Sequence, residues 1–173
     1  MRIRDSPRAK DAFAMILPFL WKLFFLSGMV CLVSVYVLSF GRMSGNQMFP
    51  AVRDGDLCVF YRLEPYQVND VVIYRTEGGE RKLGRILACQ GQTVKIRKDG
   101  GILVNGQVPA EEIFYPTYPA EKEEITYPLE IPQNAVFILN DFRQETDDSR
   151  ENGPVELKAL EGKLLFLLRR RGF

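Results

Sequence analysis

The sequence indicates a mainly β domain, built on an antiparallel sheet, that follows one N-terminal transmembrane helix. Two observations support this assignment. An uninterrupted apolar run covers residues 23–40, and later residues form short β-branched and aromatic runs separated by Gly, Pro and Asp. A spanning helix needs ~20 mostly apolar residues, with a lower limit of ~17. We therefore expect a cytoplasmic tail at 1–12, a transmembrane helix at 13–40 and an extracellular β domain at 41–173.

The N-terminal flank sets the predicted orientation. Four basic residues precede the apolar run: Arg2, Arg4, Arg8 and Lys10. Short flanks rich in Lys and Arg stay in the cytoplasm, so the domain after the helix is expected outside the cell membrane. The alternative is a cleavable signal peptide, whose apolar core runs ~7–15 residues. The longer run and a poor cleavage site at 39–41 favour the uncleaved anchor, and the absence of a polar face excludes a buried soluble helix.

The outer region contains a series of predicted strands. They cover Leu57–Leu63, Val71–Tyr74, Arg81–Cys89, Ala135–Leu139 and Lys163–Leu168, with a hairpin of 94–96 and 102–104 around the turn at 99–101. The run 164–168 is apolar throughout, which favours a strand buried on both faces. Between Pro109 and Pro132, several prolines and a cluster of acidic residues predict a long exposed excursion.

Composition excludes several functions. The chain has 23 Lys and Arg against 22 Asp and Glu, so it offers no basic footprint for nucleic acid. It contains no histidine, which excludes a Ser-His-Asp triad, and it lacks Cys-x-x-Cys spacing, which argues against zinc. We expect no metal and no cofactor. Cys58 and Cys89 are interpreted as two small buried thiols, with their pairing left open.

Four blocks of sequence carry a resemblance to a known family. They are Ser44–Asp56 (SGNQMFPAVRDGD), Asn69–Tyr74 (NDVVIY), Gly84–Val94 (GRILACQGQTV) and Leu139–Gly153 (LNDFRQETDDSRENG). In order and spacing they resemble the Ser-Met-x-Pro, Gly-Asp-Ile-Val-Val, Lys-Arg-Ile-Ile-Gly and Gly-Asp-Asn-Arg to Asp-Ser-Arg blocks of type I signal peptidases, the S26-like family. The resemblance covers nearly the whole outer domain, and it implies a signal-peptidase-like β fold behind an N-terminal anchor.

Two residues depart from this pattern where it matters for chemistry. Gln47 stands where the resemblance implies a serine nucleophile, and Gly84 stands where it implies a lysine base. A glutamine amide is neither nucleophile nor base, and glycine has no side chain. We therefore expect no catalytic residues and no peptidase activity. We also expect the loss of a lysine at Gly84 to remove a buried cation and to open volume.

A relocated dyad is the alternative. Lys82 lies two residues before Gly84, so on a strand it shares that face with its Cα about 6.6–6.8 Å away. Ser44 lies three residues before Gln47, an odd offset that points to the opposite face of an extended chain. The serine that matches Ser149 supports the lysine in the family. An active signal peptidase with a relocated Ser44 and Lys82 dyad therefore stays open.

The resemblance also implies roles for the remaining residues. Asp141, Arg143, Asp148, Ser149 and Arg150 match the family's structural acid–base block and are expected to be scaffold. The family binds its substrate as an extended strand, a mode that needs no nucleophile. The candidate peptide-binding residues are Met43, Ser44, Gln47, Met48, Lys82, Leu83 and Gly84.

Within the family, a short outer domain without either catalytic residue resembles the SipA-type proteins of Gram-positive pilus gene clusters. This implies a non-catalytic assembly factor, or chaperone, for sortase-dependent pilus polymerisation. Its partners are then pilin subunits, a class C sortase, or both, and it binds no nucleic acid. Two alternatives are a groove that is vestigial, with binding elsewhere, and a membrane-tethered regulator of a true peptidase.

Overall fold

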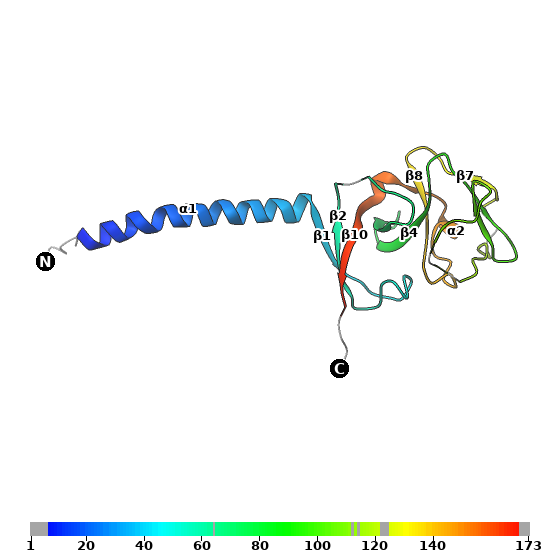
Figure 1. Ribbon diagram of the computed structural model, residues 1–173, viewed down its shortest axis with the longest axis horizontal. Helices are drawn as coiled ribbons and strands as arrows, with labels where there is room; N and C mark the ends of the chain where they lie inside the picture. Colours follow the sequence, from blue (N-terminus) through cyan, green and yellow to red (C-terminus); the bar gives the residue numbers. More distant parts are fainter. Residues whose placement is uncertain (1–6, 64, 112, 114, 122–124, 170–173) are drawn as a thin grey trace. The chain divides into compact units, whose positions relative to one another are not determined.

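The computed structural model describes residues 7–63, 65–111, 113, 115–121 and 125–169, and the chain divides into two compact units after Val37. In the first unit, helix α1 runs over Pro7–Tyr36 (Figure 1). Its segment Ile16–Tyr36 has 21 residues, none of them buried, and is long and apolar enough to cross a membrane. This helix fits membrane anchoring of the chain.

The helix begins and ends earlier than the predicted span of 13–40. Its last predicted residues instead form strand β1, Leu38–Arg42, which pairs along its whole length with β2, Leu57–Tyr61. Ser39 and Gly41 are weaker helix formers than the residues before them, and pairing with β2 satisfies their backbone groups. Residues 1–6 of the predicted tail lie outside the described part of the chain.

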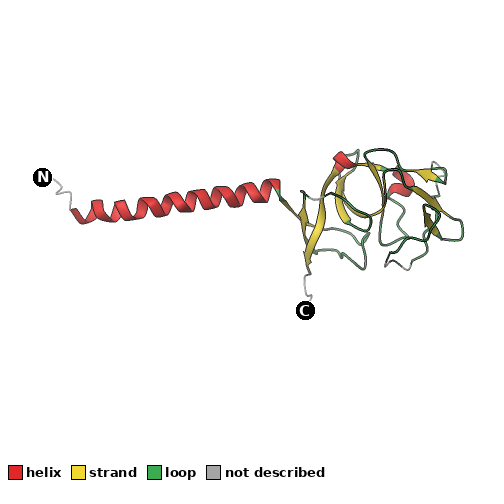
Figure 2. Cartoon of the chain, turned by 45° about the horizontal axis from the view of Figure 1, so that its top comes forward, coloured by secondary structure: helices red, strands yellow, loops and turns green. Residues whose placement is uncertain are grey.

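The second unit consists of two antiparallel sheets (Figures 1 and 2). The larger has the order β1-β2-β10-β3-β4-β8-β9 and the smaller has the order β6-β5-β7. The remaining strands are β3 Val71–Arg75, β4 Arg81–Cys89, β5 Thr93–Ile96, β6 Ile102–Val104, β7 Leu129–Glu130, β8 Ala135–Leu139, β9 Val155–Glu156 and β10 Leu160–Leu168. Two short helices, α2 Ser149–Asn152 and the 3-10 helix η1 Leu157–Ala159, precede β10. The predicted mainly β, antiparallel fold is confirmed.

Strand β10 makes the larger sheet curl. Its first half, Leu160–Lys163, pairs with β3, and its second half, Lys163–Leu168, pairs with β2. The register shifts within both halves, between 160 and 162 and between 164 and 166. Such bulges bend and twist a strand, and the sheet accordingly wraps round on itself in Figure 2.

Each face of the larger sheet has its own apolar cluster. One contains Met48, Phe60, Ile73 and Leu83, among others, and the opposite one contains Val72, Tyr74, Ile86 and Ile138 with their neighbours. A third cluster joins the two sheets through residues such as Val94, Ile131 and Phe137. Successive side chains of a strand point to opposite faces, so neighbours on β4 contribute to different clusters.

Two predictions need correction. Strand β10 is not buried on both faces, because Leu165, Phe166 and Leu168 are 54%, 49% and 56% exposed. One face of β10 has no layer packed over it among the described residues. The excursion 109–132 is not exposed throughout either, since Thr117 and Ile131 are buried and it supplies β7. Its residues 112, 114 and 122–124, which include most of the acidic cluster, lie outside the described ranges.

Candidate functional site

The loop between β1 and β2 carries Gln47. Backbone bonds close it at its base: Met43 N donates to Asp56 O at 3.0 Å, and Gly55 N donates to Met43 O at 2.9 Å. Met48 is 3% exposed and anchors the loop in the apolar cluster that also contains Leu83. Packing and hydrogen bonds therefore hold Gln47 in place on this loop.

Gln47 itself is half-buried and contacts two segments. Its carbonyl oxygen accepts a hydrogen bond of 2.9 Å from Phe142 N, which joins the loop to the segment after β8. Its side-chain Oε1 lies 3.0 Å from the point where a Cβ on Gly45 would stand. The amide of Gln47 is thus folded over its own loop.

Gly84 lies buried in β4, opposite Val72 of β3. A methyl group on its Cα would overlap Cγ2 of Ile138 and would lie 3.5 Å from the Tyr74 ring and from the Leu139 carbonyl oxygen. The prediction that Gly84 opens volume is therefore wrong. Ile138, which is fully buried, occupies the space that a side chain at position 84 would need.

The strand alternation of β4 separates the candidate residues. Leu83 packs in the cluster of Met48, with Met43 against it, whereas Gly84 adjoins Ile138 and Tyr74 of the opposite cluster. The structure therefore brings Met43, Met48 and Leu83 together as one apolar wall. Position 84 points to the other face of the sheet.

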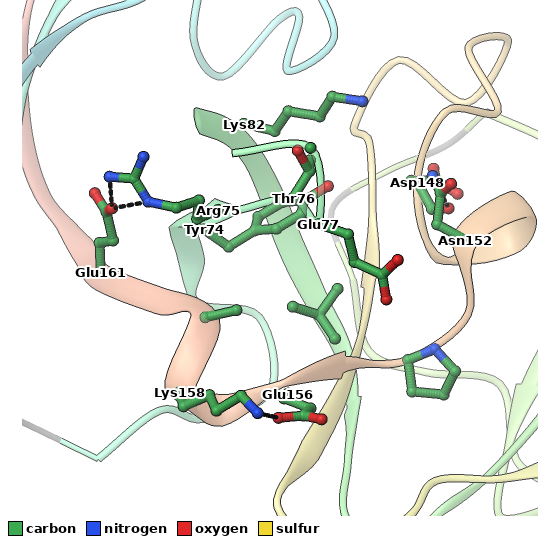
Figure 3. A pocket seen from close by; sticks show the side chains of 14 residues that line it. Tyr74, Arg75, Thr76, Glu77, Lys82, Asp148, Asn152, Glu156, Lys158 and Glu161 are labelled. Atoms are coloured by element: carbon green, nitrogen blue, oxygen red, sulfur yellow. Dashed lines mark hydrogen bonds and ion pairs between the residues drawn. The ribbon is translucent and has the colours of Figure 1, made fainter. Parts of the chain in front are cut away.

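Lys82 shares that other face. Its Nζ lies 2.5 Å from Oδ2 of Asp147, and the hydrogen bond from Lys82 lowers the pKa of Asp147. Figure 3 shows Lys82 beside Tyr74 on the wall of a pocket. Ser44 is exposed on its loop, and the partner that the structure gives Lys82 is Asp147 rather than Ser44.

Other titratable groups near β4 are held neutral. Burial, followed by the charges of Asp148 and Asp147, raises the pKa of Tyr74. Burial and the charge of Asp56 raise the pKa of Cys58 to about 11. Cys58 and Cys89 are both free thiols, with Cys58 fully buried. Neither the phenol nor the thiol is activated for nucleophilic attack.

Ser149 is the first residue of α2 and is 1% exposed. Its Oγ accepts a hydrogen bond of 2.9 Å from Ile138 N, so the hydroxyl satisfies a backbone group of β8. Asp148 caps α2 by accepting from Arg150 N at 2.9 Å. Ser149 thus positions Ile138, the residue that fills the space beside Gly84.

Buried ion pairs shape the segment after β8. Asp148 and Arg150 are fully buried and paired at 2.8 Å, and Asp141 accepts two bonds of 2.7 and 2.6 Å from Arg85. Arg143, also fully buried, donates to Glu111 at 2.6 Å. These contacts are structural, because each carboxylate is engaged by a guanidinium rather than directed at a reacting group.

Two strand edges near this loop have no hydrogen-bonded neighbouring strand among the described residues. Strand β1 ends the sheet order, so only one of its edges is paired. On β4, residues 81–84 pair with β3, whereas β8 pairs only from Arg85 onward. Arg81 Nη2 donates to Ser39 Oγ at 3.2 Å and connects the two segments. Unpaired edges of this kind are templates for an added extended strand.

The part of the chain that the structure describes holds no group of three His, Cys, Asp or Glu side chains arranged to bind a metal ion. The site therefore consists of a loop, two strand edges and an apolar wall. A sequence profile described as "Signal peptidase, peptidase S26" matches residues 16–168. The chain belongs to this signal peptidase family.

Individual signal peptidases agree with this assignment. Signal peptidase I of Bacillus caldolyticus is 24% identical over 160 residues, covering 84% of this chain and 87% of the relative. Probable signal peptidase I-1 of Synechocystis is 27% identical over 157 residues, covering 80% and 77%. Probable thylakoidal processing peptidase 2 of Arabidopsis thaliana is 30% identical over 134 residues, which are 70% of this chain and 35% of that longer relative.

A crystal structure of a signal peptidase I from Enterococcus faecalis also resembles this signal peptidase homologue. It has 25% sequence identity and a TM-score of 0.48, and the match covers 58% of this chain and 97% of the crystallised one.

Sequence reasoning missed three residues that define the site of this signal peptidase homologue. Ile138 and Tyr74 fill the space beside Gly84, and Asp147 binds Lys82. Lys82 and Asp147 are 65 positions apart, so no local pattern connects them. The strand at 135–139 was predicted from the sequence, but the partner of each residue depends on sheet register.

Proposed function

We propose that this signal peptidase homologue binds an extended peptide without cleaving it, and that it acts as an assembly factor for surface pilins. The observation that carries the proposal is the packing at Gly84. Ile138 fills the position of the expected base, so position 84 has neither a lysine nor room for one without rearrangement.

The chemistry of amide cleavage supports this proposal. Attack needs a nucleophile together with a group that accepts its proton, and the two act as a unit. In a serine protease, loss of either member costs on the order of 10⁶-fold in kcat. Gln47 and Gly84 supply neither function, and the side chain of Lys82 is paired with Asp147.

Peptide binding needs no catalytic residue and uses the free strand edges and the apolar wall. The free edges of β1 and of residues 81–84 offer backbone N–H and C=O groups to an added strand. Met43, Met48 and Leu83 form an apolar wall for the side chains that face it. Because side chains of an extended peptide alternate, every second residue of the bound segment meets this wall.

The pilin partner rests on the sequence resemblance to SipA-type proteins. In this proposal the groove holds a segment of a pilin subunit or of a class C sortase while the subunits are joined. The apolar helix of residues 16–36 supports an assembly role at the cell membrane, where exported pilins pass. The domain is then extracellular, with the N-terminus inside.

Cleavage and assembly are tested separately. The full chain in detergent micelles is incubated with a preprotein that carries an Ala-x-Ala site, beside an active signal peptidase I as positive control. We expect no product. Deletion of the gene is expected to leave pilin monomers at the surface without polymer. Accumulation of unprocessed preproteins would contradict the assembly role and would favour a regulator of a true peptidase.

The second candidate is an active signal peptidase with Ser44 and Lys82 as its dyad. The names of its relatives, which are peptidases, favour it. It predicts turnover that disappears in Lys82→Ala and in Ser44→Ala. Product formed by the wild type and lost in both variants would replace the non-catalytic proposal with this one.

A further inference from the structure

A polar pocket of about 480 Å³ lies beside β1. Three arginines and one glutamate dominate its lining, together with a serine and a tyrosine. They are Arg62, Arg75, Arg81, Glu161, Ser39 and Tyr66. Arg81 and Ser39 also connect the two strand edges of the candidate peptide site, but the proposed function makes no use of the charges in this cluster.

The charges of the pocket are not balanced. Arg75 Nη2 lies 2.5 Å from Glu161 Oε1, a pair visible in Figure 3, and Arg81 Nε lies 2.7 Å from Glu161 Oε2. Two guanidinium groups thus share a single carboxylate. The lining therefore has an excess of positive charge, which attracts an anion.

Hydrogen-bond donors are also in excess. A guanidinium carries five N–H groups. Arg75 directs Nη1 to Gly79 O at 3.0 Å in addition to its bonds with Glu161, and Arg81 directs Nη2 to Ser39 Oγ at 3.2 Å. Each of these side chains has more N–H groups than these contacts use, and the two are 52% and 38% exposed. A planar guanidinium with spare donors suits the oxygens of a phosphate.

We propose that this pocket binds a phosphate oxyanion, supplied by the headgroup of an anionic membrane lipid. Ser39 follows the end of the apolar helix at Tyr36 by three residues. A chain of three residues reaches at most about 11 Å. The headgroup layer adds roughly 5–8 Å to each side of the hydrocarbon core, so the lipid phosphates lie within the reach of this short connection.

The neighbouring strands favour a lipid over free phosphate as the source. Phe40 of β1 and Phe166 of β10 both pair with Val59 of β2, and they are 52% and 49% exposed. Leu168 and Leu57 form the next row, at 56% and 41% exposed. Ser39 and Phe40 are neighbours on β1 and point to opposite faces, so the pocket and the apolar strip lie on the two sides of this edge strand. A lipid whose headgroup enters the pocket at the edge of β1 has the strip on the other side of the same strand for apolar contact.

The test uses the full chain in micelles of a neutral detergent. The probes are dihexanoyl phosphatidylglycerol, dihexanoyl phosphatidylcholine and inorganic phosphate, and the readout is the dissociation constant from thermal-shift titration. We expect phosphatidylglycerol to bind at least about tenfold more tightly than the other two probes. Arg75→Gln and Arg81→Gln are each expected to weaken the binding of phosphatidylglycerol about tenfold, because each removes a charge-assisted hydrogen bond.

Arg97→Gln is the matched control, because Arg97 is 48% exposed and is likewise paired with a carboxylate, that of Asp99 at 3.2 Å. Equal losses in Arg97→Gln and Arg81→Gln would overturn the proposal, as would equal binding of the two lipids. Phosphate bound as tightly as phosphatidylglycerol would overturn the lipid source. If circular dichroism shows that Arg81→Gln does not fold, Arg81→Lys replaces it, because lysine keeps the positive charge but lacks the planar pair of guanidinium donors. Weaker lipid binding by Arg81→Lys would support the proposed guanidinium–phosphate contact, and unchanged binding would contradict it.

Discussion

Gly84 has no side chain, yet the space beside its Cα is filled. Ile138 lies across it from β8, and Ser149 fixes the backbone of Ile138 through a hydrogen bond to its N–H. Gly84 has no positive φ that would call for glycine. The reason for glycine at this position is therefore the close approach of β8, and a lysine could return only if Ile138 moved.

A single methyl group tests this packing. Gly84→Ala is expected to lower the free energy of unfolding of the β domain by about 1–3 kcal/mol, because it overpacks against Ile138. The matched control is Gly78→Ala, where a Cβ meets only Thr76 Oγ1 at 3.8 Å and the change is expected to stay within about 0.5 kcal/mol. Both are measured by urea titration of the full chain, followed by circular dichroism. Equal stabilities of the two variants would contradict the packing argument.

The Lys82 and Asp147 ion pair gives a pH-dependent prediction. Its hydrogen bond lowers the pKa of Asp147 from 3.8 in the folded state. A lowered pKa contributes stability that is fully present above the unfolded value and is lost as pH falls through the folded value. Lys82→Met removes this contribution. Its destabilisation, at most about 1 kcal/mol for such a partly exposed pair, is therefore expected at pH 7 and is expected to vanish in acid, once the pH has fallen through the lowered pKa of Asp147.

The measurement compares thermal unfolding of wild type and Lys82→Met between these pH values. Lys98→Met, at an exposed lysine in the turn before β6, is the control for a general effect of net charge. A difference between wild type and Lys82→Met that persists unchanged in acid would show that the ion pair does not cause it.

Strands β4 and β8 were predicted from the sequence residue for residue, whereas β1 was not. Ala135–Leu139 is an apolar run, and Arg81–Cys89 mixes basic and apolar residues; both segments are bounded by turn residues, and such local signals suffice. Residues 38–40 continue the apolar run of the helix, so their change to a strand depends on pairing with β2. The candidate positions Gln47 and Gly84 followed from sequence, but their surroundings follow from the register between β4 and β8.

The excursion between β6 and β8 depends on one buried arginine. The side chain of Arg143 is fully buried and donates to Glu111 at 2.6 Å and to Thr117 Oγ1 at 3.1 Å. Removal of the charged partner of a buried cation typically costs about 3–5 kcal/mol. Glu111→Gln is expected to release this segment locally, so that limited proteolysis cuts within 109–132 faster than in wild type.

Glu130→Gln serves as the control for that prediction, because Glu130 is an exposed residue of β7 in the same segment. Unchanged proteolysis of Glu111→Gln, at protease concentrations that distinguish folded from urea-treated protein, would show that Arg143 does not hold the excursion in place.

The whole chain combines an apolar helix with a β domain that has unpaired strand edges among its described residues. A binder tethered to a membrane meets segments that emerge there at a raised effective concentration, so even modest affinity becomes useful. This advantage exists only if the domain lies on the side where exported proteins emerge. The proposed function and the proposed lipid site therefore share one requirement, the orientation of the helix.

That orientation is tested by labelling a cysteine in intact cells. Val108 is 78% exposed, so Val108→Cys is expected to react with a membrane-impermeant maleimide added outside, whereas Lys10→Cys in the N-terminal flank is expected to react only after lysis. Cys31 and Cys89 are replaced by serine. Cys58 is kept, because its burial and a pKa of about 11 leave it a neutral, unreactive thiol at pH 7. Labelling of Lys10→Cys in intact cells, with Val108→Cys protected, would place the domain in the cytoplasm and would contradict the assembly role.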